Sequence, residues 1–273
     1  MNETKKLTPE EKWEQATIAN NFIFYKVMRN NPDVCKELLE ILLEMEIDHI
    51  EMKQEETVEI DYGKKGIRLD VYAVGASQAY NIEMQTSDTG ELPERARYYQ
   101  GALDIDDLNA GVDYKLLKDS YVIFICIKDI FEKGLAKYTF ENLCLENPKI
   151  KLNDRAYKLF FIAENYDKIL NEDQKSFLKL VTSNESTSAF ADRISKLVEN
   201  AKHNTQWRKQ YMDWEREKAV SFRLGKEEGE QQKAVEDAII AVKEFNATPE
   251  YAAQKMNAPL ELVLQELSKC NQQ

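Results

Sequence analysis

Two segments decide the fold of this chain: IRLDVYA at residues 67–73 and YNIEMQ at residues 80–85. In the first segment apolar and polar residues alternate, which is the period of a β-strand with one buried face. The pleat directs Asp70 away from that face, and in the second segment it turns Glu83 and Gln85 to one side together. The six residues between the segments suit the turn of an antiparallel hairpin. The pattern therefore predicts that Asp70 and Glu83 face one site.

Two carboxylates on neighbouring strands can hold a metal ion. An Asp, a Glu and a third polar group at the rim of a sheet favour Mg²⁺, a hard cation that takes oxygen ligands. Such a site indicates metal-assisted hydrolysis of a phosphodiester bond. The alternative is that Asp70 and Glu83 are two surface carboxylates on a hairpin. That alternative explains neither their shared face nor the motifs beside them.

The composition indicates a soluble globular protein with a substantial core. The chain has 273 residues, of which 43% are hydrophobic, and this is enough for one large domain and an appendage. No apolar run approaches the ~20 residues that span a bilayer. Residues 1–6 lack the apolar stretch of a signal peptide. We therefore expect a cytoplasmic protein with no membrane contact.

Cysteine and histidine usage excludes several classes of site. The four cysteines are widely separated without a Cys-x-x-Cys pair, and only two histidines exist. Zinc sites and disulfide frameworks are therefore not expected. A nucleophile triad built on His49 or His203 is equally unexpected.

The formal net charge of -12 opposes non-specific binding of nucleic acid by the whole surface, because the phosphates would be repelled. Any DNA contact must therefore be local. Two basic stretches flank the carboxylates: residues 64–68, with Lys65 and Arg68, and residues 94–99, with Arg95. Each stretch has an alternative interpretation as an ordinary solvated face.

The rest of the first two thirds of the chain predicts alternating helices and strands. Apolar residues at helical spacing predict two helices between residues 20 and 42, and a proline in the first turn predicts a helix from residue 92. The unbroken apolar run at residues 121–127 is typical of a strand buried on both faces. The expected elements after residue 42 are strands at about 50–62, 67–73 and 80–85, a helix at 92–108, strands at 121–127 and 157–162, and a helix near 172–182.

From about residue 187 the sequence is helical and heavily charged. Residues 248–256 and 260–267 predict two short helices joined by a tight turn, as in a helix-turn-helix. The second helix carries almost no positive charge, which favours packing against a partner or a second copy over reading a DNA groove. We therefore expect one domain at residues 1–185 and a helical region at residues 186–273, which supports homo-oligomerisation or forms a helix-turn-helix segment.

Taken together, these motifs resemble one family: the recombination-promoting nuclease and putative transposase proteins of bacteria, a branch of the PD-(D/E)xK nuclease superfamily. The resemblance covers roughly residues 17–170. It implies a restriction-endonuclease-like α/β core of helix, three-strand meander, helix and strand, with a helical C-terminal extension. The stretches that carry it are NNFIFYKVM at 20–28, GIRLDVYA at 66–73, NIEMQ at 81–85, LPERARYYQ at 92–100, YVIFI at 121–125 and YTFEN at 138–142.

The resemblance implies a DNA endonuclease that depends on Mg²⁺ or Mn²⁺ and acts in recombination, mobile-element biology or phage defence. By position, Asp70 is the metal-bridging carboxylate and Glu83 is the second metal ligand. Gln85 is the third catalytic residue, at the place where the superfamily usually has lysine. A neutral amide can orient water but lacks the charge of an ammonium. Asn21 stands where this branch usually has an aspartate.

Five residues are candidates for contact with nucleic acid: Lys65, Arg68, Arg95, Tyr99 and Gln100. Arg95 and Tyr99 lie four residues apart, so they share one face of the expected helix, and Gln100 follows directly. Such side chains could contact a phosphate near the carboxylates. The alternative is that Tyr99 is a core residue.

A different class of function is also open: a nuclease-fold protein with weak catalysis that acts as a regulatory or protein-interaction module. Asn21 and the net acidity favour it. Met212 stands near the start of the C-terminal helical region, and the resemblance implies that a short product of an internal start could inhibit the full-length chain. A true transposase would also need strand transfer, for which the sequence offers no signature.

Overall fold

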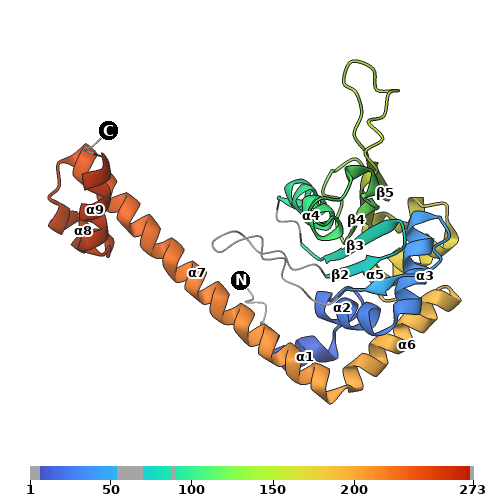
Figure 1. The fold of residues 1–273 in the computed structure, drawn as a ribbon. Coiled ribbons are helices and arrows are strands. Elements are labelled where there is room, and N and C mark those ends of the chain that lie inside the picture. The colour runs from blue at the N-terminus through green and yellow to red at the C-terminus, as the bar shows by residue number, and fades with distance from the viewer. Residues whose placement is uncertain (1–6, 54–69, 88–89, 271–273) are drawn as a thin grey trace. The chain divides into compact units, whose positions relative to one another are not determined.

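The computed structural model describes residues 7–53, 70–87 and 90–270 (Figure 1). Helices and strands alternate through the first two thirds of the chain, and helices alone follow. In chain order the elements are α1 (Pro9–Glu14), α2 (Asn21–Asn30), α3 (Pro32–Leu43), β1 (Glu51–Met52), β2 (Val71–Val74), β3 (Gln78–Gln85), α4 (Leu92–Asp107), η1 (Tyr114–Leu116), β4 (Asp119–Cys126), β5 (Lys137–Phe140), β6 (Ala156–Ile162), η2 (Ala163–Lys168), α5 (Glu172–Ser183), α6 (Ala189–His203), α7 (Thr205–Phe245), α8 (Pro249–Met256) and α9 (Leu260–Cys270).

The described strands form one mixed sheet in the order β1-β2-β3-β4-β6-β5. β1, β2 and β3 pair antiparallel, which confirms the predicted meander, although residues 54–69 of its first two strands lie outside the described residues. β3, β4 and β6 run parallel. Parallel neighbours need a crossover connection, and α4 supplies it between β3 and β4. The α/β core predicted from the sequence is therefore confirmed.

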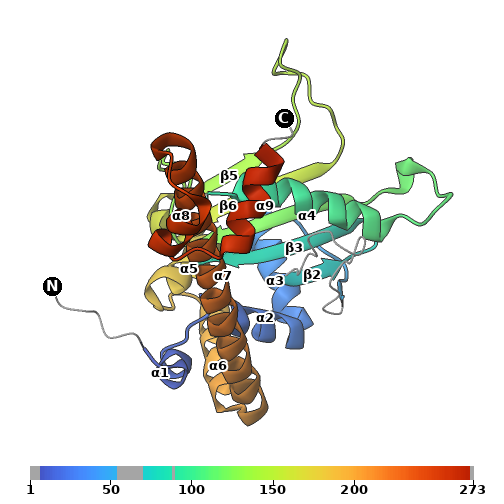
Figure 2. The same cartoon turned by 90° about the vertical axis from the view of Figure 1, so that its left-hand side faces the viewer.

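Helices cover both faces of the sheet. α4 packs over β3 and β4 on one face, whereas α2 lies against β2 and β3 on the other (Figure 1, Figure 2). Alternation along β3 sends Tyr80 and Ile82 to the α2 face, and it sends Glu83 to the α4 face, where the register places it beside Phe124. All four side chains are buried. β4 therefore lies in the middle of the core, as its unbroken apolar run predicts.

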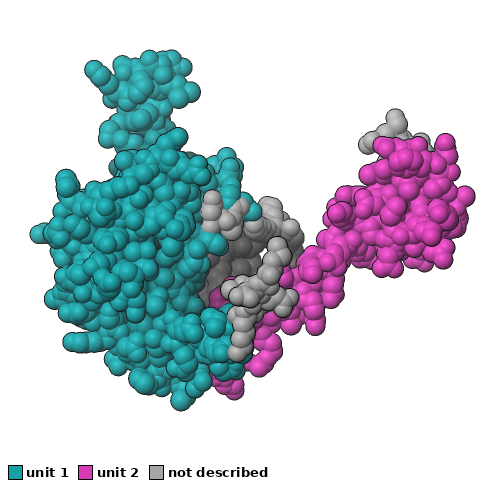
Figure 3. All heavy atoms as spheres, turned by 180° about the vertical axis from the view of Figure 1, so that it is seen from behind, with its two compact units in different colours: residues 1–208 teal, residues 209–273 magenta. Residues whose placement is uncertain are grey.

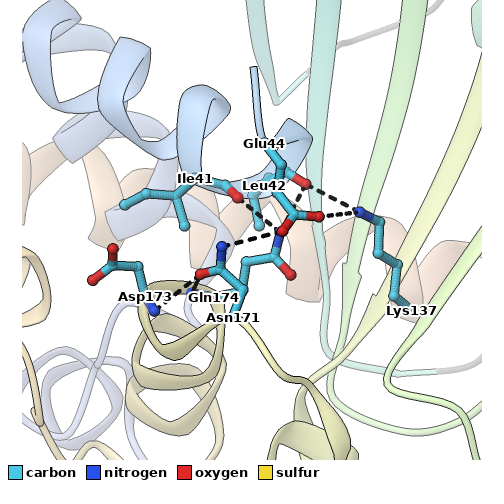
Figure 4. A network of polar contacts seen from close by, with 7 residues as sticks. All are labelled: Ile41, Leu42, Glu44, Lys137, Asn171, Asp173 and Gln174. Atoms are coloured by element: carbon cyan, nitrogen blue, oxygen red, sulfur yellow. Dashed lines mark hydrogen bonds and ion pairs between the residues drawn. The ribbon is translucent and has the colours of Figure 1, made fainter. Parts of the chain in front are cut away.

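A polar network joins the end of α3 to the start of α5 (Figure 4). The side-chain amide of Gln174 donates to two carbonyl oxygens in the last turn of α3, at 2.8 and 3.2 Å. Such carbonyls have no partner inside their own helix. Asn171, which caps α5, donates to Glu44 Oε1 at 3.2 Å, and Glu44 Oε2 lies 3.5 Å from Lys137 Nζ on β5. The network therefore ties two helices to one edge of the sheet.

The chain divides into two compact units, residues 1–208 and 209–273, which Figure 3 shows in teal and magenta. The sequence placed this boundary at residues 185 and 186. The difference lies in α6, which packs against α2 and α5. The indole N–H of Trp13 also donates to the carbonyl of Lys202 in α6, at 3.2 Å. α6 is therefore part of the unit that contains the sheet.

The second unit contains the two short helices expected from the sequence, α8 and α9. They pack against each other and against the C-terminal part of α7 around a small apolar cluster. Its buried members are Val235, Ala238, Ala252, Ala253 and Val263. Residues 216–233 of α7 are exposed. No helix in the described residues is both long and apolar enough to cross a membrane.

β5 is absent from the strands that the sequence predicts. It lies at the edge of the sheet and pairs with β6 so that Phe140 stands opposite Lys158. After β5 the chain forms an arm, residues 141–155, which extends away from the sheet and returns to β6 (Figure 1). One isolated bridge, between Leu143 and Lys151, joins its two sides.

Candidate active site

Asp70 and Glu83 lie opposite each other at one end of the β2–β3 hairpin. The register pairs Val71 with Ile82, so Asp70, which directly precedes β2, stands beside Glu83. The Asp70 N–H donates to Glu83 Oε1 at 3.0 Å, and the Met84 N–H donates to Asp70 Oδ2 at 3.2 Å. Each carboxylate thus accepts a hydrogen bond from the opposite strand. These two bonds hold both side chains in place.

The electrostatic environment of Glu83 is unfavourable for a lone carboxylate. Glu83 is 2% exposed, and this burial raises its pKa well above the usual value, with the nearby Asp70 carboxylate raising it further. The N–H of Asp70, the amide of Asn81 and the guanidinium of Arg95 lower the pKa, but they do not offset the burial. The site therefore holds two adjacent carboxylates whose repulsion is only partly compensated.

Arg95, in the first turns of α4, is the cation beside this pair. Its Nη2 lies 3.5 Å from Glu83 Oε2 and donates to the Tyr99 hydroxyl at 3.0 Å, while its Nη1 donates to Gln85 Oε1 at 3.1 Å. The guanidinium also lies 5.8 Å from the centroid of the Phe124 ring. The side chain of Arg95 keeps 27% of its surface exposed. It therefore holds three neighbours in position and still reaches solvent.

Gln85 is the last residue of β3 and is buried. Its side-chain oxygen accepts from Arg95, and its side-chain N–H donates to the carbonyl of Ser87. Because side chains in a strand alternate, Gln85 lies on the same face as Glu83. The amide is therefore fixed next to the carboxylate pair.

Tyr99 connects the site to the core beneath α4. It is buried, and its ring stacks on Phe124 with the centroids 6.2 Å apart and the planes at 14°. Burial and the charge of Glu83 raise the pKa of Tyr99, despite its hydrogen bond with Arg95. The hydroxyl is therefore a neutral group, which accepts from Arg95.

The structure brings together Asp70, Glu83, Gln85, Arg95 and Tyr99 but places Gln100 elsewhere. Gln100 is buried, and its side-chain amide donates to the carbonyl of Ser120 at 3.3 Å and to its hydroxyl. Ser120 pairs with Ala79 near the start of β3, at the far end of that strand from Gln85. Gln100 is thus bonded inside the protein and does not point at the carboxylate pair.

The remaining candidates are Lys65, Arg68 and Asn21. Lys65 and Arg68 lie outside the described residues. Asn21 is the first residue of α2, directly after the capping residue Asn20, and contributes a neutral side chain there. Sequence reasoning missed Asn81, which is fully buried two residues before Glu83 on the same strand. An asparagine inside a strand is uncommon, and that was the available signal.

The donor set fits a hard divalent cation. Within the described ranges no group of three or more His, Cys, Asp or Glu side chains converges as a metal cluster. Mg²⁺, however, usually keeps several waters and is bound by only one or two protein carboxylates. Asp70 and Glu83 are such a pair, and their mutual repulsion favours a cation between them. Gln85 adds an amide oxygen at the same end of β3.

The sequence matches the model of one protein family, described as PD-(D/E)XK nuclease family transposase, over residues 19–218. This match spans most of the chain. The chain belongs to the PD-(D/E)XK nuclease family transposases. It has no match among the curated proteins or among the solved structures.

Membership of the PD-(D/E)XK family confirms the resemblance and the fold class expected from the sequence. It indicates a nuclease or transposase-like function, and nucleases of this kind act on DNA and generally use divalent metals. The matched range starts before α2 and ends within α7, so it includes the sheet, α4 and α6. The PD-(D/E)XK family match thus covers the whole candidate site.

Proposed function

We propose that this protein is a cytoplasmic, metal-dependent DNA endonuclease that acts in recombination, mobile-element biology or phage defence. The observation that best supports the proposal is the cross-strand pair of Asp70 and Glu83, held by two backbone hydrogen bonds beside Arg95. A purely structural role explains this arrangement poorly, because burying a carboxylate next to a like charge lowers stability. Such a cost is typical of functional sites.

In this proposal Asp70 and Glu83 hold a Mg²⁺ or Mn²⁺ ion, and Gln85 stands beside them. When bound, the divalent cation lowers the pKa of a coordinated water and stabilises negative charge on the phosphate. The protein side chains position the metal ligands, the water and the phosphate. Arg95 keeps Glu83 and Gln85 in place and offers its exposed edge to a phosphate, and Gln85 orients water by hydrogen bonding rather than by charge.

Cleavage of supercoiled plasmid, titrated with Mg²⁺ and with Mn²⁺, tests the proposal. Wild-type protein is compared with Asp70→Ala and Glu83→Ala. Glu94→Ala is the matched control, because Glu94 is an exposed carboxylate one residue before Arg95. We expect metal-dependent cutting by wild type and by the control, and loss of cutting in both site variants.

Circular dichroism establishes that each variant is folded. If folded Asp70→Ala protein still cuts DNA, Asp70 and Glu83 do not form the active site. If folded wild-type protein cuts DNA with neither metal, it is not an endonuclease under these conditions. Asn21→Asp would then test whether a third carboxylate restores cutting.

A regulatory function is the second candidate, and the surface of α9 favours it. Leu260 and Leu264, four residues apart and so on one face of this helix, are both exposed, and neighbouring exposed apolar side chains are typical of interaction surfaces. We propose that the C-terminal helices mediate self-association and that a product starting at Met212 binds the full-length chain and inhibits it. A pull-down of residues 212–273 with the full-length protein is expected to show association. Its absence would remove the idea.

A further inference from the structure

A pocket lies beside the candidate site, between the first turns of α4, β5, β6 and the loop before β5. Its volume is about 480 Å³, and its lining includes Arg97, Phe131, Phe140, Lys158 and Phe160. This volume falls within the range of small-molecule sites. Neither Asp70 nor Glu83 lines the pocket, so it is separate from the carboxylate pair.

Three aromatic rings form the apolar wall of the pocket. The Phe131 centroid lies 5.1 Å from that of Phe160 and 5.3 Å from that of Phe140, and Phe140 lies edge-on to Phe160 at 5.8 Å. Phe160 is buried, but Phe140 is 42% exposed. The wall therefore presents a ring to solvent, which a closed core cluster would not do.

Two cationic side chains line the same pocket. Arg97 is exposed on α4, and Lys158 is half-buried on β6, directly opposite Phe140 in the register. Within the described residues neither makes an ion pair; Lys158 only stabilises the more distant Asp104 carboxylate electrostatically. By contrast, the acidic residue of the pocket, Glu141, is paired with Lys151 at 2.6 Å. In a chain of net charge -12, this combination favours an anionic ligand with an aromatic part.

The pocket is aligned with the carboxylate pair across the sheet. Glu83 stands opposite Phe124 on β4, and Phe124 stands opposite Phe160 on β6, with their rings stacked at 5.2 Å. Two steps between neighbouring strands span roughly 10 Å. Along one DNA strand this corresponds to about three nucleotides of helical rise. The separation between Glu83 and the pocket is therefore no longer than a few nucleotides of one strand.

We propose that this pocket binds an unstacked nucleotide of the DNA strand, with the base against Phe140 and the phosphates near Arg97 and Lys158. Base stacking on an aromatic side chain tolerates any base because every base has a π-face. The inference rests on the proposed nuclease function, since it assigns the pocket to the same substrate. It gives the enzyme a preference for DNA that is single-stranded or easily unpaired next to the cleaved bond.

Binding of a fluorescein-labelled oligothymidine of about 12 nucleotides, a typical length for single-strand sites, tests the proposal by fluorescence anisotropy. EDTA in the buffer prevents cleavage. Phe140→Leu keeps apolar bulk but removes the π-face, and Phe140→Tyr keeps the ring. We expect Phe140→Leu to weaken binding about fivefold or more, and Phe140→Tyr to bind like wild type. Tyr114→Ala, which removes an 81% exposed ring elsewhere, is the control and is expected to leave binding unchanged.

The cations are tested through the salt dependence of the same binding. Each phosphate contact that is lost reduces the steepness of the fall of log K with log salt by about 0.7 for a single strand. We expect this change for Arg97→Gln and for Lys158→Gln, but not for Lys196→Gln, an exposed lysine on α6. Unchanged affinity in Phe140→Leu would show that the pocket does not bind a nucleotide. A wild-type protein that does not bind the oligonucleotide would show the same.

These outcomes are distinguishable from failure of the nuclease proposal. Metal-dependent plasmid cutting together with unchanged binding by Phe140→Leu would support the nuclease function but exclude nucleotide binding in the pocket. Binding that depends on Phe140, without cutting by wild type, would support nucleotide binding in the pocket but exclude endonuclease activity.

Discussion

Replacing Arg95 by glutamine tests whether this side chain compensates the buried charge of Glu83. Within the part of the chain that the structure describes, Arg95 makes one ion pair, at 3.5 Å to Glu83, and two hydrogen bonds, at 3.1 Å to Gln85 and 3.0 Å to Tyr99. Breaking a fully buried ion pair costs about 3–5 kcal/mol. The cost here is smaller, because Arg95 is 27% exposed and solvent screens its charge. We expect Arg95→Gln to lower the free energy of unfolding by about 2 kcal/mol.

The control is Arg97→Gln, two residues along the same helix. Arg97 is exposed and has no ion pair within the described residues, so its substitution is expected to change stability by less than about 0.5 kcal/mol. Urea unfolding at neutral pH in EDTA, followed by tryptophan fluorescence, measures both variants. Trp13 is fully buried in the unit that contains the sheet and reports on its unfolding.

A double-mutant cycle makes the test specific. Once Glu83→Gln has removed the buried carboxylate, Arg95→Gln no longer leaves an uncompensated charge. We therefore expect the second substitution to cost less in that background, with a coupling energy within the usual range of about 0.5–3 kcal/mol. If Arg95→Gln is no more destabilising than Arg97→Gln, or if the two site substitutions are additive, Arg95 does not compensate the charge of Glu83.

Three further predictions concern other parts of the first unit. Gln174→Leu removes the donor of the Ile41 carbonyl and leaves the Leu42 carbonyl only its longer contact with Lys137 Nζ, and it is expected to cost about 1–3 kcal/mol in urea unfolding; an unchanged midpoint would contradict this. Burial raises the pKa of Asp129, but hydrogen bonds from backbone N–H groups and from Tyr138 bring it below its usual value of 3.8. The ionised Asp129 therefore stabilises the folded protein above pH 3.8, and this contribution is lost as the pH falls through its lowered pKa. The difference in unfolding free energy between wild type and Tyr138→Phe should therefore shrink on acidification; a constant difference would argue against this role of Tyr138. Burial raises the pKa of Cys35 to about 12, so iodoacetamide is expected to label the partly exposed Cys144 in native protein before Cys35, as read by peptide mass spectrometry; equal labelling would be evidence against the buried position.

The sheet could be predicted to a large extent because its central strands carry strong local signals. The apolar run in β4 identifies a doubly covered strand, and the alternation around Asp70 sets the register of β2 against β3. β5 has no comparable signal. It has four residues at the edge of the sheet, two of them exposed, and its position depends on pairing with β6, which follows it in the chain by 15 residues or more.

The candidate site shows the same division between local and non-local information. That Glu83 and Gln85 share a face follows from the period of a strand, and that Arg95 meets Tyr99 follows from the helical repeat. Gln100 lies roughly 140° around the helix from Arg95, which is why it turns toward Ser120. The contact between Arg95 and Glu83 could not be predicted, because it depends on how α4 crosses the sheet.

Binding of Mn²⁺ to the protein, measured by isothermal titration calorimetry, tests whether Asp70 and Glu83 form a divalent-cation site. Wild type is compared with Asp70→Asn, which keeps the shape of the side chain, and with Glu94→Gln as an exposed control. We expect saturable binding by wild type and by the control, and its loss in Asp70→Asn. Equal binding by wild type and a folded Asp70→Asn variant would contradict it.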